Sequence, residues 1–431
     1  MLTDKNSGPY YNYLVKRRSN MPVVHSLQVQ VSELKQNIKE NDFNDFLISI
    51  TEKILIHKPE MVIDVAEGRL ENTALENEII RIIDSGKNRT LFKREDLIKR
   101  VFDFLFGYGE LQKYIDDEEI TDIDGTSYNR FVIKRNGIRE KLDISFGNER
   151  IFDTYCKLIA IRNNGILNEN DNHCRVTDEK NRLRINLSVR PRSITGPTIS
   201  IRKHRKTAYD INDLLKLGMV NKQIKKLIES MAKCDATVIF CGKGAAGKTT
   251  LLRAFVDSMP EMERVLIAES DCEIYPNKPY CIQHRIKKKN EGGIDVTLQD
   301  LIRDGLTMSL DTYCIGEITG NEAWDFIKAS FSGHRCTGTI HAENAQAVFA
   351  RLMALARGES SSYSERTIMQ MAAEGIDAVV YMKNFRVEEI LEVTGFDADS
   401  ETAVTKILYH RQTGETVFSP SDRLLSKGVC I

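Results

Sequence analysis

Apolar positions in the first 90 residues recur at helical spacing between long polar stretches. Phe46, Leu47 and Ile50 follow this period, which predicts an amphipathic helix over residues 43–56. We therefore expect residues 1–90 to be a polar helical N-terminal extension. This pattern is typical of a surface extension, and a docking arm for a partner is the alternative.

Residues 91–203 carry short strand and helix patterns that are typical of a compact α+β domain. The first helix is predicted to end at Gly107, and a second amphipathic helix follows further on. Strands are predicted on both sides of a turn that contains Asn136 and Gly137. The predicted helices cover residues 97–106 and 151–161, and the predicted strands include residues 131–134, 182–189 and 197–202.

After residue 208 the pattern changes to alternating buried strands and helices, which is the mark of a parallel α/β sheet. The short basic segment at residues 204–208 is the expected linker between the two domains. Residues 209–431 are therefore predicted to be one α/β domain. Its clearest strands cover residues 236–241, 264–268, 312–315, 378–382 and 406–409, and its clearest helices cover residues 221–232 and 250–258.

Length and composition narrow the class of protein. A chain of 431 residues is too long for one hydrophobic core, so two or three domains are expected. The 61 basic and 62 acidic residues give a net charge of -1, so the chain lacks the overall positive charge of a general nucleic-acid binder. Since the sequence has no run of roughly 18 apolar residues, any membrane association is expected to depend on partners.

The nine cysteines are odd in number, and none belongs to a CxxC pair. Several of them, such as Cys241, lie in apolar strand patterns. We interpret them as reduced, mostly buried thiols in a reducing compartment rather than as zinc ligands.

The strongest chemical signal is a phosphate-binding loop directly after the strand that ends at residue 241. It matches GxxxxGK[ST] in full, and a helix is predicted to follow it, as the chemistry requires. Glycines allow backbone N–H groups to surround phosphates, and the helix N-terminus adds partial positive charge. Lys248 is expected to reach the β- and γ-phosphates, and Thr249 is expected to bind Mg²⁺. The expected nucleotide-binding residues of this loop are Gly242, Lys243, Gly244, Ala245, Ala246, Gly247, Lys248, Thr249 and Thr250.

Two acidic runs at strand ends are candidates for the metal and water chemistry of an NTPase. Glu317 ends an apolar strand pattern, as a Walker B acid does. Glu269, Asp271 and Glu273 lie just beyond another strand pattern. Because ligands of open parallel sheets bind at the carboxyl ends of the strands, we expect both runs to face the phosphate-binding loop.

Two histidines, His334 and His341, lie in a Gly- and Thr-rich segment downstream of these acids. This position suggests a γ-phosphate sensor or a coupling strand. A metal ion bound by both histidines is the competing idea, but no third ligand is evident, so no metal cluster is expected.

The order of these motifs resembles the type II/type IV secretion ATPases, most closely their CpaF-like branch. The likeness extends from about Phe102 to Asp397. It implies a RecA-like P-loop NTPase core domain of the α/β class, preceded by a smaller α+β N-terminal domain, in a homohexamer with ATP between the two domains. The four motifs in the family order are Walker A at residues 242–249, an Asp box at residues 269–273, Walker B at Gly316-Glu317, and a His box at residues 333–342.

The N-terminal domain carries further segments like those of the family. Residues 107–111, followed by residues 117–123, resemble the opening segment of the family. In this family, arginines of the N-terminal domain close onto the nucleotide phosphates. The resemblance therefore assigns Arg175, Arg184 and Arg202 to nucleotide binding, with surface salt bridges as the alternative.

Two positions depart from the family pattern. Ser270 stands where the family usually has Asp after its glutamate, and Thr319 stands in the segment after Walker B that usually contains an arginine. These changes are candidates for slowing hydrolysis, or for shifting a role to Arg335 or Arg351.

The resemblance implies a cytoplasmic ATPase that powers pilus assembly, protein secretion or conjugative transfer through an inner-membrane platform protein. ATP and Mg²⁺ are the expected cofactors. Glu269 or Glu273 would orient or deprotonate the attacking water. Glu317 would complete the Mg²⁺ site with Thr249, and His341 would sense the γ-phosphate.

Two other functions remain open at this point. A nucleic-acid motor on the same core needs a basic channel, to which the run at residues 285–289 is a weak pointer. A nucleotide-binding regulator with little hydrolysis is the second, and it is motivated by Ser270 and Thr319. Nucleic acid is not the expected partner.

Overall fold

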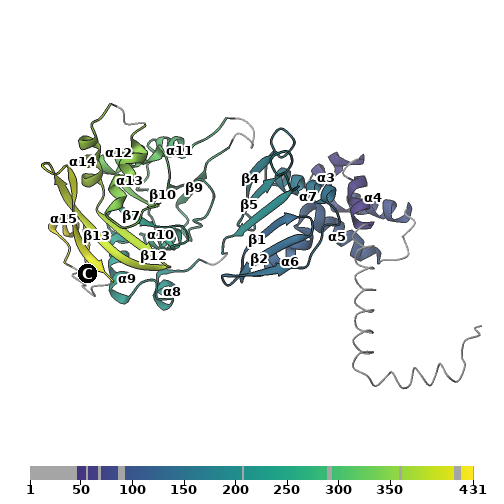
Figure 1. Cartoon of the computed structure of the whole chain (residues 1–431), viewed down its shortest axis with the longest axis horizontal. Coiled ribbons are helices and arrows are strands. Elements are labelled where there is room, and N and C mark those ends of the chain that lie inside the picture. Colours follow the sequence, from purple (N-terminus) through teal and green to yellow (C-terminus); the bar gives the residue numbers. More distant parts are fainter. Residues whose placement is uncertain are drawn as a thin grey trace, which may run out of the picture. The chain divides into compact units, whose positions relative to one another are not determined.

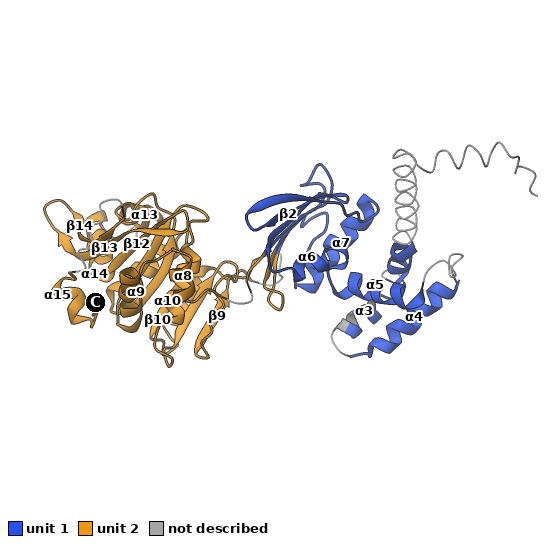
Figure 2. Cartoon of the chain, turned by 90° about the horizontal axis from the view of Figure 1, so that it is seen from below, with its two compact units in different colours: residues 1–175, 185–202 blue, residues 176–184, 203–431 orange. Residues whose placement is uncertain are grey.

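The computed structural model describes residues 46–54, 57–66, 69–85, 93–205, 208–288, 294–358, 362–411 and 419–430. The chain divides into two compact units, coloured separately in Figure 2. One contains Met1–Arg175 and Ile185–Arg202, and the other contains Val176–Arg184 and Lys203–Ile431. The domain boundaries drawn from the sequence stay a prediction, and a hairpin segment of the N-terminal half groups with the second unit.

The described part of the first unit begins with a helical layer that buries an apolar stripe. Of the helix predicted over residues 43–56, the described part, residues 46–54, is helical. Leu47, Ile50 and Ile54 from this segment join one apolar cluster with side chains of the helices that follow. Those helices are α3 (Pro59–Ala66), α4 (Asn72–Ser85) and α5 (Arg94–Phe106), of which the last ends at Gly107 as predicted.

The helices are followed by a six-stranded sheet in the order β3-β2-β1-β6-β5-β4, of which the adjoining ends of β4 and β5 group with the second unit. Asn136 and Gly137 both have positive φ, at 48° and 85°, and form the predicted turn between β2 and β3. The elements are η1 (Gly109–Leu111), α6 (Gln112–Asp116), β1 (Ile120–Ser127), β2 (Arg130–Arg135), β3 (Ile138–Leu142), α7 (Glu149–Arg162), β4 (His173–Asp178), β5 (Leu183–Ser188) and β6 (Thr198–Lys203).

The second unit is built on an eight-stranded sheet in the order β14-β13-β12-β7-β11-β10-β8-β9. The strands from β12 to β9 pair in parallel, and β13 and β14 extend the sheet in antiparallel. One strand, β11, separates β7 from β10, which gives the RecA-like α/β core expected from the sequence. The strands are β7 (Val238–Gly242), β8 (Val265–Glu269), β9 (Cys281–Arg285), β10 (Thr312–Ile318), β11 (Arg335–Ile340), β12 (Ala378–Lys383), β13 (Arg386–Asp397) and β14 (Thr402–His410).

Helices cover both faces of this sheet (Figure 1). Val238 and Phe240 of β7 join the apolar core on one face, whereas Ile239 and Cys241 join the core on the other. This alternation explains why β7 has no polar side chain: both of its faces are buried. The helices are α8 (Ile211–Lys216), α9 (Lys222–Lys233), α10 (Lys248–Asp257), α11 (Leu298–Gly305), α12 (Glu322–Phe331), α13 (Ala347–Ala356), α14 (Glu365–Gly375) and α15 (Asp422–Ser426).

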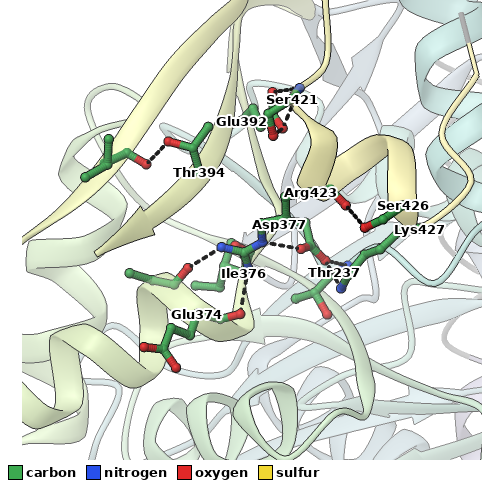
Figure 3. Close-up of polar contacts among 12 residues, drawn as sticks. Thr237, Glu374, Ile376, Asp377, Glu392, Thr394, Ser421, Arg423, Ser426 and Lys427 are labelled. Carbon is green, nitrogen blue, oxygen red and sulfur yellow. Dashed lines mark hydrogen bonds and ion pairs between the residues drawn. The ribbon is translucent and has the colours of Figure 1, made fainter. Parts of the chain in front are cut away.

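A buried ionic cluster fastens the C-terminal segment, residues 419–430, to this core (Figure 3). Asp377, directly before β12, is fully buried and accepts a hydrogen bond from the backbone N–H of Thr237 at 2.8 Å. Its carboxylate also pairs with Arg423 Nε at 3.2 Å and Lys427 Nζ at 2.6 Å, at the two ends of α15. We call these four residues the C-terminal clasp.

A second buried acid holds the start of the same segment. Glu392 of β13 is fully buried and accepts hydrogen bonds from the backbone N–H and the hydroxyl of Ser421. Arg423 adds bonds to backbone carbonyls at the end of α14.

None of the described helices combines the length and apolar composition that a bilayer span requires.

Candidate functional site

The phosphate-binding loop joins β7 to α10, as the motif predicts. Gly242 and Gly247 have positive φ, at 148° and 96°. A Cβ on Gly242 would collide with the carbonyl oxygen of Met382, and one on Gly247 would lie 2.8 Å from Met219 Cε. Both positions therefore require glycine, and they let the chain curl closely enough for its N–H groups to surround a phosphate. The helix starts at Lys248, two residues before the predicted start.

Lys248 is folded back over the loop. Its side chain is 7% exposed, and Nζ donates a hydrogen bond to the carbonyl oxygen of Lys243 at 3.2 Å. Burial lowers the pKa of Lys248, whereas the nearby carboxylates of Glu317 and Glu273 act in the opposite direction. Lys248 is thus held at the loop, and the carboxylates of Glu317 and Glu273 lie near enough to favour its charged form.

The strand register brings the predicted residues to one edge of the sheet. Cys241 of β7 lies beside Ile340 of β11, and Gly338 of β11 lies beside Ile315 of β10. Ile315 in turn lies beside Ala268 of β8. The residues that follow these partners are therefore gathered at the carboxyl ends of adjacent strands, as we expected from the parallel sheet. They are Gly242, His341, Glu317 and Glu269.

Glu317 and His341 form a pair beside the loop. His341 Nε2 lies 2.6 Å from Glu317 Oε1, and the two side chains are 47% and 43% exposed. A Cβ on Gly244 would lie 3.7 Å from His341 Cε1, so the imidazole stands next to the phosphate-binding loop. The carboxylate of Glu317 and the hydroxyl of Thr249 are oxygen donors of the kind that Mg²⁺ prefers. The glycine-lined cradle and this donor set fit a Mg²⁺-nucleotide.

Glu269 differs from the solvated acid that its sequence suggests. It is 2% exposed, and its Oε1 accepts hydrogen bonds from the backbone N–H groups of Glu273 at 3.0 Å and Ile274 at 2.9 Å. Its Cγ lies beside Gly316, where an added Cβ would approach it to 2.8 Å. Burial raises the pKa of Glu269 to about 8, so the carboxyl is mostly protonated at neutral pH. A protonated acid cannot take a proton from water, so the geometry favours a supporting role for Glu269.

The raised pKa of Glu269 predicts how stability changes with pH. A carboxyl with a folded pKa of about 8 and an unfolded pKa near 4.5 stabilises the fold fully below pH 4.5 and loses that contribution as the pH rises to 8. A glutamine at this position keeps the amide-accepting oxygen and cannot ionise. We therefore expect Glu269→Gln to match the wild type near pH 5 and to be more stable at pH 8, by a margin growing at most about 1.4 kcal/mol per pH unit.

Urea unfolding followed by the emission of Trp324, the only tryptophan of the chain, measures the second unit alone. Glu273→Gln, on the same loop and more exposed, is the matched comparison. A constant difference between wild type and Glu269→Gln from pH 5 to pH 8 would contradict the raised pKa.

Glu273 is the acid that reaches the cavity beside the loop. Its Oε1 accepts a hydrogen bond from Arg184 Nη1 at 3.0 Å, and Arg184 also lies 3.6 Å from Asp271. Of the three arginines predicted from the resemblance, Arg184 is the one that the second unit places near the acidic run. It therefore holds the water-activating candidate in an ion pair.

The cavity itself adjoins the start of α10 and has a volume of about 290 Å³. It lies within the second unit. Three consecutive basic residues and a fourth on α10 line it, against a single acid, so its lining is strongly positive. The lining residues are Lys203, His204, Arg205, Ala208, Tyr209, Thr249, Thr250, Arg253, Glu273 and Phe385. The sequence had pointed to three of these as nucleotide-site residues, Thr249, Thr250 and Glu273.

Arg175 and Arg202 belong to the first unit. Arg175 lies on β4, and Arg202 lies on β6, where its half-exposed side chain pairs with Asp122 at 3.5 Å. A surface salt bridge of this kind is the alternative that the sequence left open for Arg202. Their contact with a nucleotide stays a prediction.

The two histidines of the Gly/Thr-rich segment are separated by a whole strand. His334 precedes β11 and stacks edge-on against Tyr313, whereas His341 follows the same strand. A six-residue strand spans about 20 Å, so the two cannot bind one metal ion. The described residues contain no group of three or more metal-ligating side chains.

The structure also locates Thr319, which departs from the family pattern, and the two arginines that were candidates for a shifted role. Arg335 is 4% exposed and pairs with Glu263 at 2.8 Å at the start of β11, the edge opposite the loop, so it cannot take over a role at the phosphates. Arg351 is exposed on α13. The N–H of Thr319 donates to Glu322 of α12, so Thr319 takes part in starting that helix.

The chain can be compared with known proteins. Residues 168–380 match the model of the type II/IV secretion system protein family. A putative conjugal transfer protein of Mycobacterium tuberculosis is 31% identical over 175 residues, which cover 40% of this chain and 50% of that protein. VirB11 of Agrobacterium fabrum is 28% identical over 165 residues, which cover 37% and 47%. The chain thus spans about half the length of the curated relatives it matches.

Solved structures show weaker likeness. The ATPase DotB of Legionella pneumophila is 16% identical, with 67% of this chain and 80% of that chain covered and a TM-score of 0.47. The pilus retraction motor PilT with bound ADP is 13% identical, with 69% and 81% covered and the same TM-score. The narrower CpaF-like branch stays a prediction. The resemblance itself is confirmed: residues 168–380, which contain the phosphate-binding loop, both acidic runs and His341, match the model of the type II/IV secretion system protein family.

Proposed function

We propose that this chain is an ATPase that converts ATP hydrolysis into work on a secretion, pilus or conjugation machine. The observation that carries the proposal is the convergence of Lys248, Glu317 and His341 at one edge of the sheet. Type II/IV family membership supports the same class of activity.

The proposed chemistry divides the tasks among these residues. The amides of residues 242–249 and Lys248 bind the phosphates, and Thr249 and Glu317 hold Mg²⁺, which when bound neutralises the charge that develops on the transferred phosphoryl group. Glu273 orients the attacking water, and Glu269 holds the loop that carries Glu273. His341 senses the terminal phosphate through its contact with Glu317.

The proposed assembly is a homohexamer. Arg175, Arg184 and Arg202 are proposed to reach the nucleotide, and a hinge at residues 203–208 is proposed to convert hydrolysis into domain movement. A platform protein of the inner membrane is the proposed partner of this cytoplasmic ring.

The test of this proposal is ATP hydrolysis by the purified full chain and by Glu317→Gln. We expect the wild type to release phosphate from ATP only when Mg²⁺ is present. Glu317→Gln keeps the size of the side chain but loses its charge, so turnover is expected to fall at least about 100-fold while ATP binding persists. Phosphate release and the binding of a fluorescent ATP analogue measure the two effects separately.

Glu343→Gln is the matched control, because this neighbouring acid is 83% exposed and lies 3.9 Å from Lys243, beyond hydrogen-bond distance. Wild type that binds ATP without releasing phosphate would favour a regulator instead. Capture of membrane proteins by Glu317→Gln with ATP bound supports the secretion function. Capture of DNA, with hydrolysis that DNA stimulates at low salt only, would favour the nucleic-acid motor.

A further inference from the structure

A buried arginine beside the cavity has two guanidinium nitrogens without a hydrogen-bond partner in the part of the chain that the structure describes. Arg253 lies on α10, five residues after Lys248, and is 7% exposed. Its Nε and Nη2 are buried, and neither has a hydrogen-bond partner among the described residues. Nearly every buried guanidinium in a folded protein is bound to an acid or a carbonyl, so this one indicates a missing acceptor.

The charges around Arg253 do not compensate it. The guanidinium cannot deprotonate in a protein, so it stays positive despite burial. Asp257 attracts it from a distance and Arg182 repels it, whereas Glu269, mostly protonated at neutral pH, contributes little. Asp257 accepts its hydrogen bond from the backbone N–H of Asn277, and Glu269 accepts from Glu273 and Ile274. Neither acid accepts a hydrogen bond from Arg253 Nε or Nη2.

The position of Arg253 on its helix directs it to the nucleotide site. Thr249 and Thr250 precede it by four and three residues, so the three side chains lie on one face of α10. All three line the 290 Å³ cavity, together with the basic residues 203–205. A cavity with this lining favours an anionic occupant.

We propose that Arg253 binds the α-phosphate of the nucleotide. Its guanidinium Nε and Nη2 would donate two hydrogen bonds to the phosphate oxygens, which makes the contact bidentate. This inference rests on the proposed function and assigns a further binding residue to it.

The choice of the α-phosphate follows from distances along the helix. Lys248, Glu317 and His341 gather at the loop, where the terminal phosphates are expected. Arg253 lies about 6 Å further along the helix axis than Thr249, since each residue adds about 1.5 Å. Side chains of a helix tilt toward its N-terminus, which returns the guanidinium toward Thr250 rather than as far as the loop. The cavity is lined by Thr249 and Thr250 but not by Lys248.

The decisive variant is Arg253→Met, which shortens the side chain only slightly and removes its charge. We expect the affinities for ATP and for ADP to fall by the same factor, about 10- to 100-fold, because both nucleotides carry the α-phosphate. Without nucleotide, the variant is expected to unfold at the same or a higher urea concentration than the wild type, because an unpaired buried charge has been removed. Isothermal titration and Trp324 emission measure the two effects.

Arg357→Met is the control, since Arg357 is 79% exposed on the surface, and it is expected to leave both affinities unchanged. Unchanged nucleotide affinity in Arg253→Met, or a loss for ATP alone, would overturn the assignment. So would unfolding at lower urea, which indicates a structural arginine. If the wild type itself binds neither nucleotide, the proposed function fails, whereas wild-type binding with an unaffected variant refutes this inference alone.

Discussion

Replacing Lys248 by alanine is expected to lower ATP turnover by about 100- to 1000-fold or more, to the limit of detection. Lys248 is the buried cation of the phosphate-binding loop, and it lies within the electrostatic reach of Glu317 and Glu273. Without it, the loop loses the cation that neutralises the charge collecting on the phosphates during transfer. Phosphate release from ATP under saturating Mg²⁺ measures the effect.

The fold is expected to survive this change. Burial opposes the charge of Lys248, and its hydrogen bond to the carbonyl of Lys243 is a single contact. Circular dichroism and Trp324 emission should therefore match the wild type. Lys216→Ala removes an exposed lysine from α8 and serves as the control, with turnover unchanged. Undiminished phosphate release by Lys248→Ala would show that catalysis occurs elsewhere.

The largest effect on stability is expected at Asp377. Asp377→Ala removes the acceptor shared by Thr237, Arg423 and Lys427 in the C-terminal clasp. Breaking a buried ion pair from one side leaves uncompensated charge, and the usual cost is about 3–5 kcal/mol. Urea unfolding monitored at Trp324 measures the loss in the second unit.

Glu374→Ala is the matched control for the clasp. Arg423 binds the backbone carbonyl of Glu374, and the carboxylate of Glu374 is exposed and bonded to Gln370. Its removal should change the free energy of unfolding by less than about 0.5 kcal/mol. Equal losses in both variants would mean that the clasp contributes no more than an ordinary surface contact.

Much of the second unit could be predicted from its sequence because local signals agree with the tertiary structure there. The strand at residues 238–242, the glycines after it and the helix that starts at Lys248 each carry their own pattern. The acidic runs could be placed near the loop because parallel strands end at one edge of the sheet.

The sequence pattern could not predict which polar side chains are buried. The run from Glu269 to Glu273 is as polar as a solvated turn, whereas the structure buries its first acid beside Gly316. Arg253 looks like a routine polar residue on a helix, since the pattern cannot reveal which acceptors fold near it. Its spacing of three and four residues from Thr250 and Thr249 was the available signal.

The bounds of strand β13, in a region predicted to be rich in strands, were not predicted for a related reason. Glu388, Glu389 and Glu392 interrupt the apolar alternation that a strand prediction relies on. Glu392 is nevertheless fully buried, because Ser421, which lies 29 residues later in the chain, supplies its hydrogen bonds. Such a distant partner cannot be read from a local window. Strand β1 was not predicted either, because its Asp and Thr residues also interrupt the apolar alternation.

The clasp also has a consequence for synthesis on the ribosome. Asp377 is synthesised before Arg423 and Lys427. During that interval its carboxylate lacks the two cations with which it pairs in the folded protein. Domains fold as their segments emerge from the N-terminal side. The second unit is therefore expected to lack this part of its packing, and the stability that it contributes, until α15 has left the exit tunnel.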